Sequence, residues 1–297
     1  MDEQPQQPVP ALIVAGFLGS GKTTLVDHLL RQAQAEGVRL AIVSNEFGDT
    51  GIDRALLDAG EEGFVELDGG CVCCKLSDAL GETLQALVAA TRPDRLVLEC
   101  SGLALPGELV IQFWRPPLDA LFSDELVVVV VDAEKVATGQ LEPLMVEQLE
   151  AADLVVLNKR DLVDAAALAE AEQRMKEITH GQPVLVAERS RVDPAVLFPP
   201  DPQRPRRQRE PEGHHEGHDH GHDRFATREL SFDGVVDGAA VVEQLRALGA
   251  LRTKGFVRTA HGIRVVQGVG ARLELTAPAR PVPDELVGKV VVIERAP

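Results

Sequence analysis

The stretch GFLGSGKT, residues 16–23, matches the phosphate-binding pattern G-x-x-x-x-G-K-[ST]. Residues 11–16 predict a strand directly before it and residues 22–36 a helix directly after it, a context that a chance glycine-rich turn would lack. Glycines let consecutive backbone N–H groups converge on phosphate oxygens, and the helix turns its positive end toward the same anion. We therefore predict a nucleotide site, in which Lys22 reaches the β- and γ-phosphates and the Thr23 hydroxyl binds Mg²⁺. The residues expected around the phosphates are Gly16, Gly19, Ser20, Gly21, Lys22, Thr23 and Thr24.

Short apolar runs rich in Val alternate with helical patterns over residues 11–199. Strands buried on both faces of a sheet are apolar nearly throughout, and helices between them make their neighbours parallel. The fold class predicted is therefore α/β, a doubly wound and mostly parallel sheet. The expected strands are 11–16, 40–45, 95–100, 126–132, 153–158 and 183–187, and the expected helices include 22–36, 75–91, 139–150 and 164–178.

Residues 198–224 interrupt this alternation with five prolines and with five of the chain's eight histidines. Such a segment buries too little apolar area to offset its ordering entropy, so we expect a flexible linker. Residues 225–297 resume regular patterns, including a helix near 238–248, and predict a small α+β domain. The expected organisation is a disordered N-terminus (1–10), a nucleotide-binding domain (11–197), the linker (198–224) and the α+β domain (225–297).

The formal net charge of −17 argues against nucleic acid as a partner, because phosphate-backbone binding needs clustered Lys and Arg. No apolar run approaches the roughly 18 residues that span a bilayer. The first ten residues, MDEQPQQPVP, lack the basic flank and apolar segment of a signal peptide. We therefore expect no membrane partner and a cytoplasmic location.

The sequence NKRD, residues 158–161, follows a buried strand and matches the guanine-reading pattern N-K-x-D. The Asp161 carboxylate can accept from both N1–H and the 2-amino group of guanine, whereas adenine offers an acceptor at N1. A charged loop after a strand is the alternative interpretation. In combination with the phosphate loop, Asn158, Lys159 and Asp161 favour GTP over ATP.

The sequence ECSG, residues 99–102, ends another apolar strand. We expect Glu99 to hold the water shell of Mg²⁺ and the Gly102 N–H to contact the γ-phosphate, as in a sensor that triphosphate orders. A strand end followed by an ordinary turn is the alternative.

Three of the four cysteines, Cys71, Cys73 and Cys74, lie within four residues. Thiolates are soft ligands that prefer Zn²⁺ or Co²⁺ to Mg²⁺, and adjacent Cys73 and Cys74 are poorly placed to bind one ion together. We therefore predict an incomplete, exchangeable metal site, with redox sensing by these thiols as the alternative. Glu46 is a candidate extra ligand or switch element, with an ordinary loop carboxylate as the alternative. Glu46 and Asp49 are both candidates for positioning the catalytic water. Imidazoles at His214, His215, His218, His220 and His222 form either a weak metal collector or unselective low complexity.

In this order and spacing, GFLGSGKTT (16–24), NEFG (45–48), GCVCC (70–74), ECSG (99–102) and NKRD (158–161) resemble the CobW-like P-loop GTPases. KGFVRT (254–259) and VVQGVG (265–270) look like the second domain of that family, although this domain is short here. The resemblance implies a GTPase domain of the SIMIBI class, GTP hydrolysis, and Zn²⁺ or Co²⁺ bound by the CxCC thiols. It also implies Lys22, Thr23 and Glu99 as phosphate and Mg²⁺ residues and Asn158 and Asp161 as guanine readers.

These expectations combine into a GTP-dependent metallochaperone that passes Zn²⁺ or Co²⁺ to a client protein. Two alternatives are a metal buffer insensitive to nucleotide and an activator GTPase that remodels a metalloenzyme without carrying its ion. A small-molecule kinase is less favoured, because no motif for a separate acceptor is apparent. We expect a monomer or a dimer that depends on nucleotide or metal.

Overall fold

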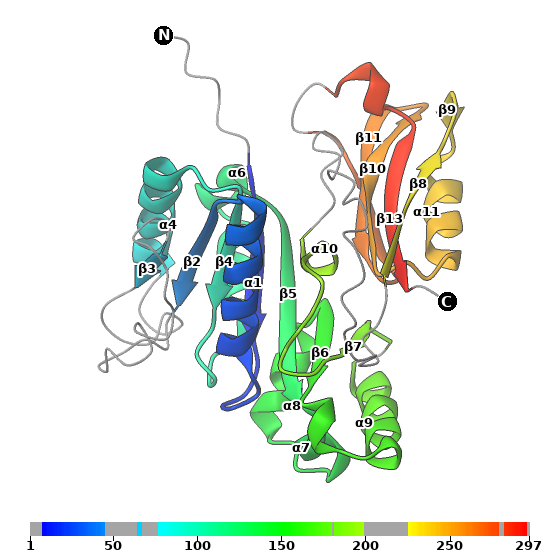
Figure 1. Cartoon of the computed structure of the whole chain (residues 1–297). Coiled ribbons are helices and arrows are strands. Elements are labelled where there is room, and N and C mark those ends of the chain that lie inside the picture. The colour runs from blue at the N-terminus through cyan, green and yellow to red at the C-terminus, as the bar shows by residue number, and fades with distance from the viewer. Residues whose placement is uncertain are drawn as a thin grey trace. The chain divides into compact units, whose positions relative to one another are not determined.

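The computed structural model describes residues 8–44, 64–66, 77–179, 181–198, 225–278 and 282–295, and the chain divides into two compact units, Met1–Phe198 and Pro199–Pro297. The first unit contains a seven-stranded sheet in the order β3-β2-β4-β1-β5-β6-β7, in which every neighbouring pair is parallel (Figure 1). Its strands are β1 (Val9–Ala15), β2 (Leu40–Ser44), β3 (Phe64–Glu66), β4 (Arg95–Glu99), β5 (Phe122–Asp132), β6 (Leu154–Asn158) and β7 (Val184–Val186).

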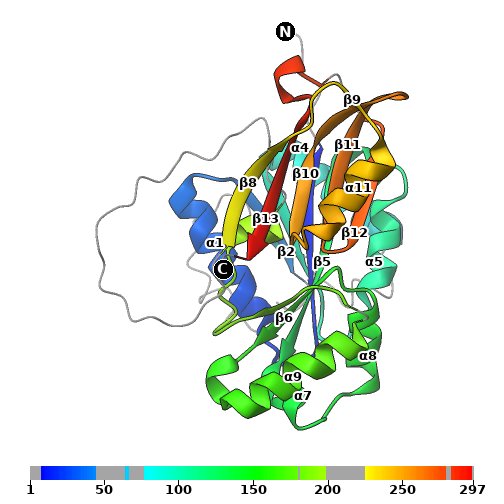
Figure 2. The ribbon, with the colours of Figure 1, turned by 90° about the vertical axis from the view of Figure 1, so that its right-hand side faces the viewer.

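Helices cover both faces of this sheet. Ile13 belongs to a hydrophobic cluster with residues of α4 to α9, whereas its neighbours Leu12 and Val14 point to the opposite face, where α1 packs on β1, β2 and β4 (Figures 1 and 2). This arrangement confirms the predicted doubly wound α/β fold. The helices are α1 (Lys22–Glu36), α4 (Ser77–Thr91), α5 (Pro106–Phe113), α6 (Leu118–Leu121), α7 (Ala133–Ala137), α8 (Pro143–Glu150), α9 (Ala165–Ile178), α10 (Pro194–Leu197) and the 3₁₀ turn η1 (Arg160–Leu162).

The helix expected over 139–150 is wrong in its first part. Gly139 has φ of 73°, which ends the α7 segment in a left-handed residue, and α8 begins only at Pro143. Proline favours the first position of a helix because its missing N–H would have no partner there. The expected helix is therefore shortened to α8, and α7 (Ala133–Ala137) precedes the expected range.

The second unit is a six-stranded, mainly antiparallel sheet in the order β12-β11-β10-β13-β8, with β9 parallel to β10. Helix α11 (Gly238–Ala247) packs on one face through Val241 and Leu245, against Val257, Val266 and Val290 of the sheet. This is the α+β unit predicted for the second part of the chain. Its strands are β8 (Phe225–Ser231), β9 (Val235–Val236), β10 (Arg252–Thr259), β11 (Gly262–Val269), β12 (Arg272–Thr276) and β13 (Lys289–Arg295), with the 3₁₀ turn η2 (Asp284–Leu286) between the last two.

Polar residues occupy the last positions of four parallel strands of the first unit. They are Ser44, Glu99, Asp132 and Asn158, which end β2, β4, β5 and β6, and all four are buried. The carboxyl ends of parallel strands meet at one edge, and ligands bind there near the point where the strand order reverses. In this sheet that point lies at β1, because the chain runs from β1 to β2 and β3 on one side and later from β5 to β6 and β7 on the other. Among the described helices, none is long and apolar enough to cross a membrane.

Candidate nucleotide-binding site

The phosphate loop connects β1 to α1 at the reversal point. Gly16, Gly19 and Gly21 have φ of 139°, 74° and 109°, a region that L side chains rarely adopt. A Cβ on Gly16 would overlap the Val130 carbonyl oxygen, and one on Gly21 would overlap the Asn158 side chain. The positions of Gly16 and Gly21 therefore require glycine for both torsion and space, and that of Gly19 requires it for torsion alone.

Two features of the loop fit an anion. Gly21 precedes α1 without any side-chain cap, so the first N–H groups of the helix face the loop uncapped. The Ser20 hydroxyl is buried, and no other group in the described part of the chain hydrogen-bonds to it. A buried donor of this kind fits a ligand oxygen.

The residues predicted to serve phosphate and Mg²⁺ lie together. The Thr23 hydroxyl donates to Glu99 Oε1 at 2.7 Å, and the Ser44 hydroxyl donates to Oε2 of the same carboxylate at 3.1 Å. Glu99 is 1% exposed and Lys22 is 3% exposed. A buried carboxylate beside a hydroxyl supplies the hard oxygen ligands that Mg²⁺ prefers, so the side chains present fit that ion.

The NKRD segment is tied to the phosphate loop. Asn158 Nδ2 donates to the Ser20 carbonyl at 2.9 Å, while Asn158 Oδ1 accepts from the backbone N–H of Ser190 at 2.6 Å. The Ser190 hydroxyl in turn donates to the Gly21 carbonyl at 2.9 Å. Asn158 therefore uses its amide to join the NKRD segment, the phosphate loop and the segment after β7.

Lys159 and Asp161 flank this network differently. Lys159 is left-handed, with φ of 63°, and its Nζ pairs with Asp132 Oδ2 at 2.6 Å. Asp161 is exposed on η1, and its carboxylate has no hydrogen bond or ion pair with any described residue. The carboxylate is thus open to an external donor.

Gly102 lies against the phosphate loop. A Cβ there would come within 2.5 Å of Leu18 Cδ2 and 3.0 Å of the Leu18 backbone N, so only glycine permits this approach. Leu18 and Leu103 remain half-exposed at this place, with 50% and 60% of their surfaces accessible.

The metal-binding predictions lie outside the described residues. They concern Glu46, Asp49, Cys71, Cys73, Cys74 and the five histidines from His214 to His222. In the part of the chain that is described, no group of three or more His, Cys, Asp or Glu could hold a metal ion. Cys100 is buried in the hydrophobic cluster of the first unit, as expected for a packed residue.

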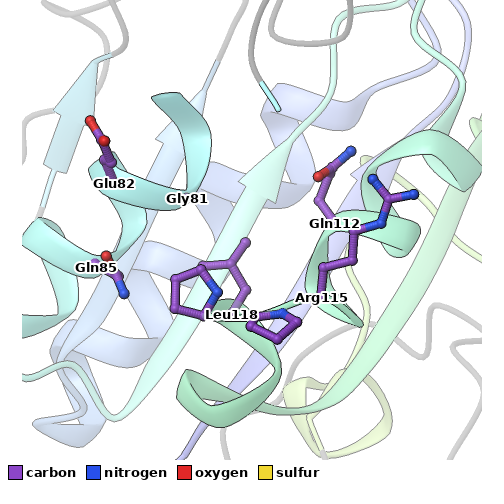
Figure 3. A pocket seen from close by; sticks show the side chains of 8 residues that line it. Gly81, Glu82, Gln85, Gln112, Arg115 and Leu118 are labelled. Atoms are coloured by element: carbon purple, nitrogen blue, oxygen red, sulfur yellow. The ribbon is translucent and has the colours of Figure 1, made fainter. Parts of the chain in front are cut away.

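A cavity of about 410 Å³ lies between α4 and the α5–α6 segment. Glu82 and Gln85 line it from α4, and Gln112 and Arg115 line it from the other side (Figure 3). Among the predicted site residues that the structure describes, none lines this cavity.

Sequence reasoning missed Ser44, Asp132 and Ser190. The first two had a readable signal, because each is the polar last residue of an apolar strand that ends at the ligand edge. Ser190 had none, since its place depends on positive φ at Arg189 and Ser190, 49° and 53°, in residues that rarely adopt it.

Comparisons with known proteins identify relatives over most of the chain. The family model described as CobW/HypB/UreG, nucleotide-binding domain, matches residues 10–186. A protein from Sinorhizobium sp named zinc chaperone CobW is 33% identical over 91% of this chain and 87% of its own. A protein from Schizosaccharomyces pombe named zinc-regulated GTPase metalloprotein activator 1 is 36% identical over 58% of this chain and 44% of its own. The crystal structure of Zn(II)-bound YjiA GTPase from E. coli is similar with a TM-score of 0.50 and 25% identity, covering 97% of this chain and 94% of that one.

Proposed function

We propose, since the chain belongs to the CobW/HypB/UreG family of nucleotide-binding domains, that it binds and hydrolyses GTP and uses this cycle to deliver Zn²⁺ to a client protein. Co²⁺ is the alternative cargo. The first unit would carry the nucleotide, and the thiols of Cys71, Cys73 and Cys74 would carry the metal ion.

The proposal that the chain binds GTP rests on two hydrogen bonds of the Asn158 side chain. Its amide bonds to the Ser20 carbonyl in the phosphate loop and to the Ser190 N–H beyond β7. These contacts tie the end of β6, three residues before Asp161, to the phosphate loop, as recognition of a whole guanosine phosphate would require. Base and phosphates would then be read by one connected structure.

For hydrolysis, Lys22 would contact the β- and γ-phosphates, and Thr23 and Glu99 would hold Mg²⁺. The ion would supply positive charge to the phosphate oxygens as the bond to the γ-phosphoryl group breaks. Gly102 would receive the γ-phosphate through its backbone N–H. Glu46 and Asp49, outside the described residues, remain the proposed candidates for orienting the attacking water.

For the cargo, three thiolates with Glu46 as a possible fourth ligand would form a site that releases its ion readily. The names of the relatives support zinc: the Sinorhizobium sp protein is a zinc chaperone and the E. coli GTPase was crystallised with Zn(II). The five histidines would collect metal weakly. The oligomeric state remains the prediction made from the sequence, a monomer or a dimer that depends on nucleotide or metal.

The decisive test is a competition titration of Zn²⁺ and Co²⁺ against a chelator, with Mg²⁺ and either GDP or a non-hydrolysable GTP analogue. Coupling between nucleotide and metal of ~1–3 kcal/mol would tighten metal binding about 5- to 150-fold in the analogue state. Cys73→Ser should abolish the effect, and Lys22→Ala should make metal affinity independent of nucleotide. Equal metal affinity with both nucleotides in the unaltered protein would contradict the coupled cycle.

A second candidate function is an activator GTPase that remodels a metalloenzyme without carrying the ion. The relative from S. pombe, named a metalloprotein activator, favours it. In that case, replacing all three clustered cysteines by Ser would leave client activation intact, whereas a metallochaperone would lose it. A metal buffer, the third possibility, would bind metal equally in every nucleotide state.

A further inference from the structure

Gln148, on α8, makes a contact that the nucleotide-binding motifs do not explain. Its side chain is fully buried, with 0% of its surface exposed. Its amide nitrogen Nε2 donates to the Gly102 carbonyl at 3.2 Å and to the Ala104 carbonyl at 2.8 Å. The Gln148 side-chain amide therefore donates both of its N–H groups to the loop that follows Glu99.

These bonds fix the orientation of the loop's peptide groups. Ala104 N–H also donates to the Ser101 carbonyl at 3.0 Å, which closes a turn around Gly102. In a trans peptide the N–H points opposite to the C=O, so the Gly102 N–H faces away from this turn. With the carbonyls of residues 101, 102 and 104 all engaged, the backbone on either side of Gly102 has little freedom to rotate.

The other end of the amide shows that packing alone does not account for a glutamine here. Gln148 Oε1 is buried and has no hydrogen-bond partner among the described residues, and a buried acceptor without a partner destabilises a fold. An apolar side chain of the same length would fill this space without that cost. The reverse amide orientation is excluded, because it would place Oε1 against two carbonyl oxygens.

We infer that Gln148 is a positioning residue for triphosphate recognition, which holds the loop of residues 101–104 in the orientation in which the Gly102 N–H would meet the γ-phosphate. The inference rests on the proposed role of Gly102 and names the group that prepares it. A donor held in place before the ligand arrives loses no conformational freedom on binding, so it gives tighter binding than a mobile one. GDP has no γ-phosphate, so the affinity of the protein for GDP should not depend on Gln148.

The test compares affinities for GDP and for a non-hydrolysable GTP analogue, both with Mg²⁺, in the full-length protein. Gln148→Met keeps the length of the side chain and removes both donors. We expect analogue affinity to fall about 5- to 30-fold, the scale of two lost neutral hydrogen bonds, and GDP affinity to change less than about twofold. The rate of GTP hydrolysis should fall with analogue affinity.

The matched control is Gln173→Met on α9, the same chemical change in an exposed residue whose side chain donates to Glu177 on the same helix. It should alter neither affinity. Equal losses for GDP and the analogue in folded Gln148→Met, or no loss for either, would overturn the inference.

Gln148→Glu covers the case in which the methionine variant does not fold, since it preserves the volume of the side chain. Its carboxylate would repel the two carbonyls at pH 8, whereas the protonated acid near pH 5.5 can donate one hydrogen bond. The ratio of analogue to GDP affinity should therefore recover partly at the lower pH relative to the unaltered protein, and a ratio that does not change with pH would overturn the inference. Failure of the proposed function gives a different result, because the unaltered protein would then bind neither GDP nor the analogue.

Discussion

Asp161 lies on η1, three residues after the buried Asn158, with its carboxylate exposed and open to an external donor. Two charged hydrogen bonds to guanine, at ~1.5–3 kcal/mol each, would favour GTP over ATP by roughly 10²–10⁴. Asp161→Asn should lower GTP affinity by a similar factor. It should raise affinity for xanthosine triphosphate, because an amide N–H can donate to the carbonyl that replaces the 2-amino group. Competition binding with the three nucleotides measures this, and unchanged GTP affinity would exclude Asp161 as the guanine reader.

His28, on α1, makes stability depend on pH. Burial lowers the pKa of His28 below 6.5, the neighbouring Arg191 lowers it further, and Asp27 opposes the shift. The unfolded chain therefore binds more protons than the folded one below about pH 6.5, so the free energy of unfolding falls as pH falls through 6.5 toward the lower folded-state pKa. His28→Gln should remove part of this fall. Urea unfolding at pH 7.5, 6.5 and 5.5 measures it, and parallel pH profiles for the two proteins would contradict the assignment.

Residues with local signatures were predictable at this scale. Lys22, Thr23 and Asn158 stand in motifs whose spacing needs no tertiary knowledge, and the structure places them around one loop. Ser190 is the opposite case: its N–H reaches Asn158 only because two consecutive residues adopt positive φ. No sequence rule predicts that conformation for Arg and Ser.

At the scale of elements, an ion pair connects Asp132, at the end of β5, to Lys159, which follows β6. Asp132 caps α7 by accepting from the Glu134 N–H at 2.9 Å, and its other oxygen pairs with Lys159 at 2.6 Å. Asp132→Asn keeps a good capping residue and removes the charge that holds Lys159. The interaction with Lys159 should weaken by about 1 kcal/mol, the difference between a charged and a neutral hydrogen bond. The affinities for GDP and for a GTP analogue should therefore both fall about fivefold.

The control for this change is Glu170→Gln, which neutralises an exposed i,i+4 pair with Arg174 on α9. Its nucleotide affinities should equal those of the unaltered protein. Titration with a fluorescent guanine nucleotide distinguishes the two variants. A selective loss of the analogue in Asp132→Asn would instead place Asp132 at the γ-phosphate.

The strands were more predictable than the helices between them. Runs such as residues 126–132 are apolar because both of their faces are covered, and that pattern is visible in the sequence. The expected helix of residues 139–150 began too early, because the helical pattern extends over residues 139–142. Gly139 and Pro143 mark the true boundary, and α8 begins at Pro143. Helix α6 was missed because its four residues are too few to show a period.

At the scale of the whole molecule, each of the two units has a hydrophobic cluster of its own, one around the parallel sheet and one between α11 and the antiparallel sheet. All described residues of the nucleotide site belong to the unit Met1–Phe198. We propose the domain boundaries 11–197, 198–224 and 225–297 on this basis. Such an organisation predicts that nucleotide stabilises one unit and not the other.

Calorimetry of the full-length protein should therefore show two unfolding transitions. A GTP analogue with Mg²⁺ at about 100 times its Kd adds ~2.7 kcal/mol to the unit that binds it, which raises the Tm of a unit of this size by roughly 5–10 °C. The second transition should stay within about 1 °C, because a ligand cannot stabilise a unit with which it makes no contact. Lys22→Ala should abolish the shift and so assign the moving transition to the parallel-sheet unit. A single transition would show that the units unfold as one, and the proposed boundaries would then divide a single cooperative domain. Two transitions that move together would show that the nucleotide stabilises both units, which contradicts a site confined to the first.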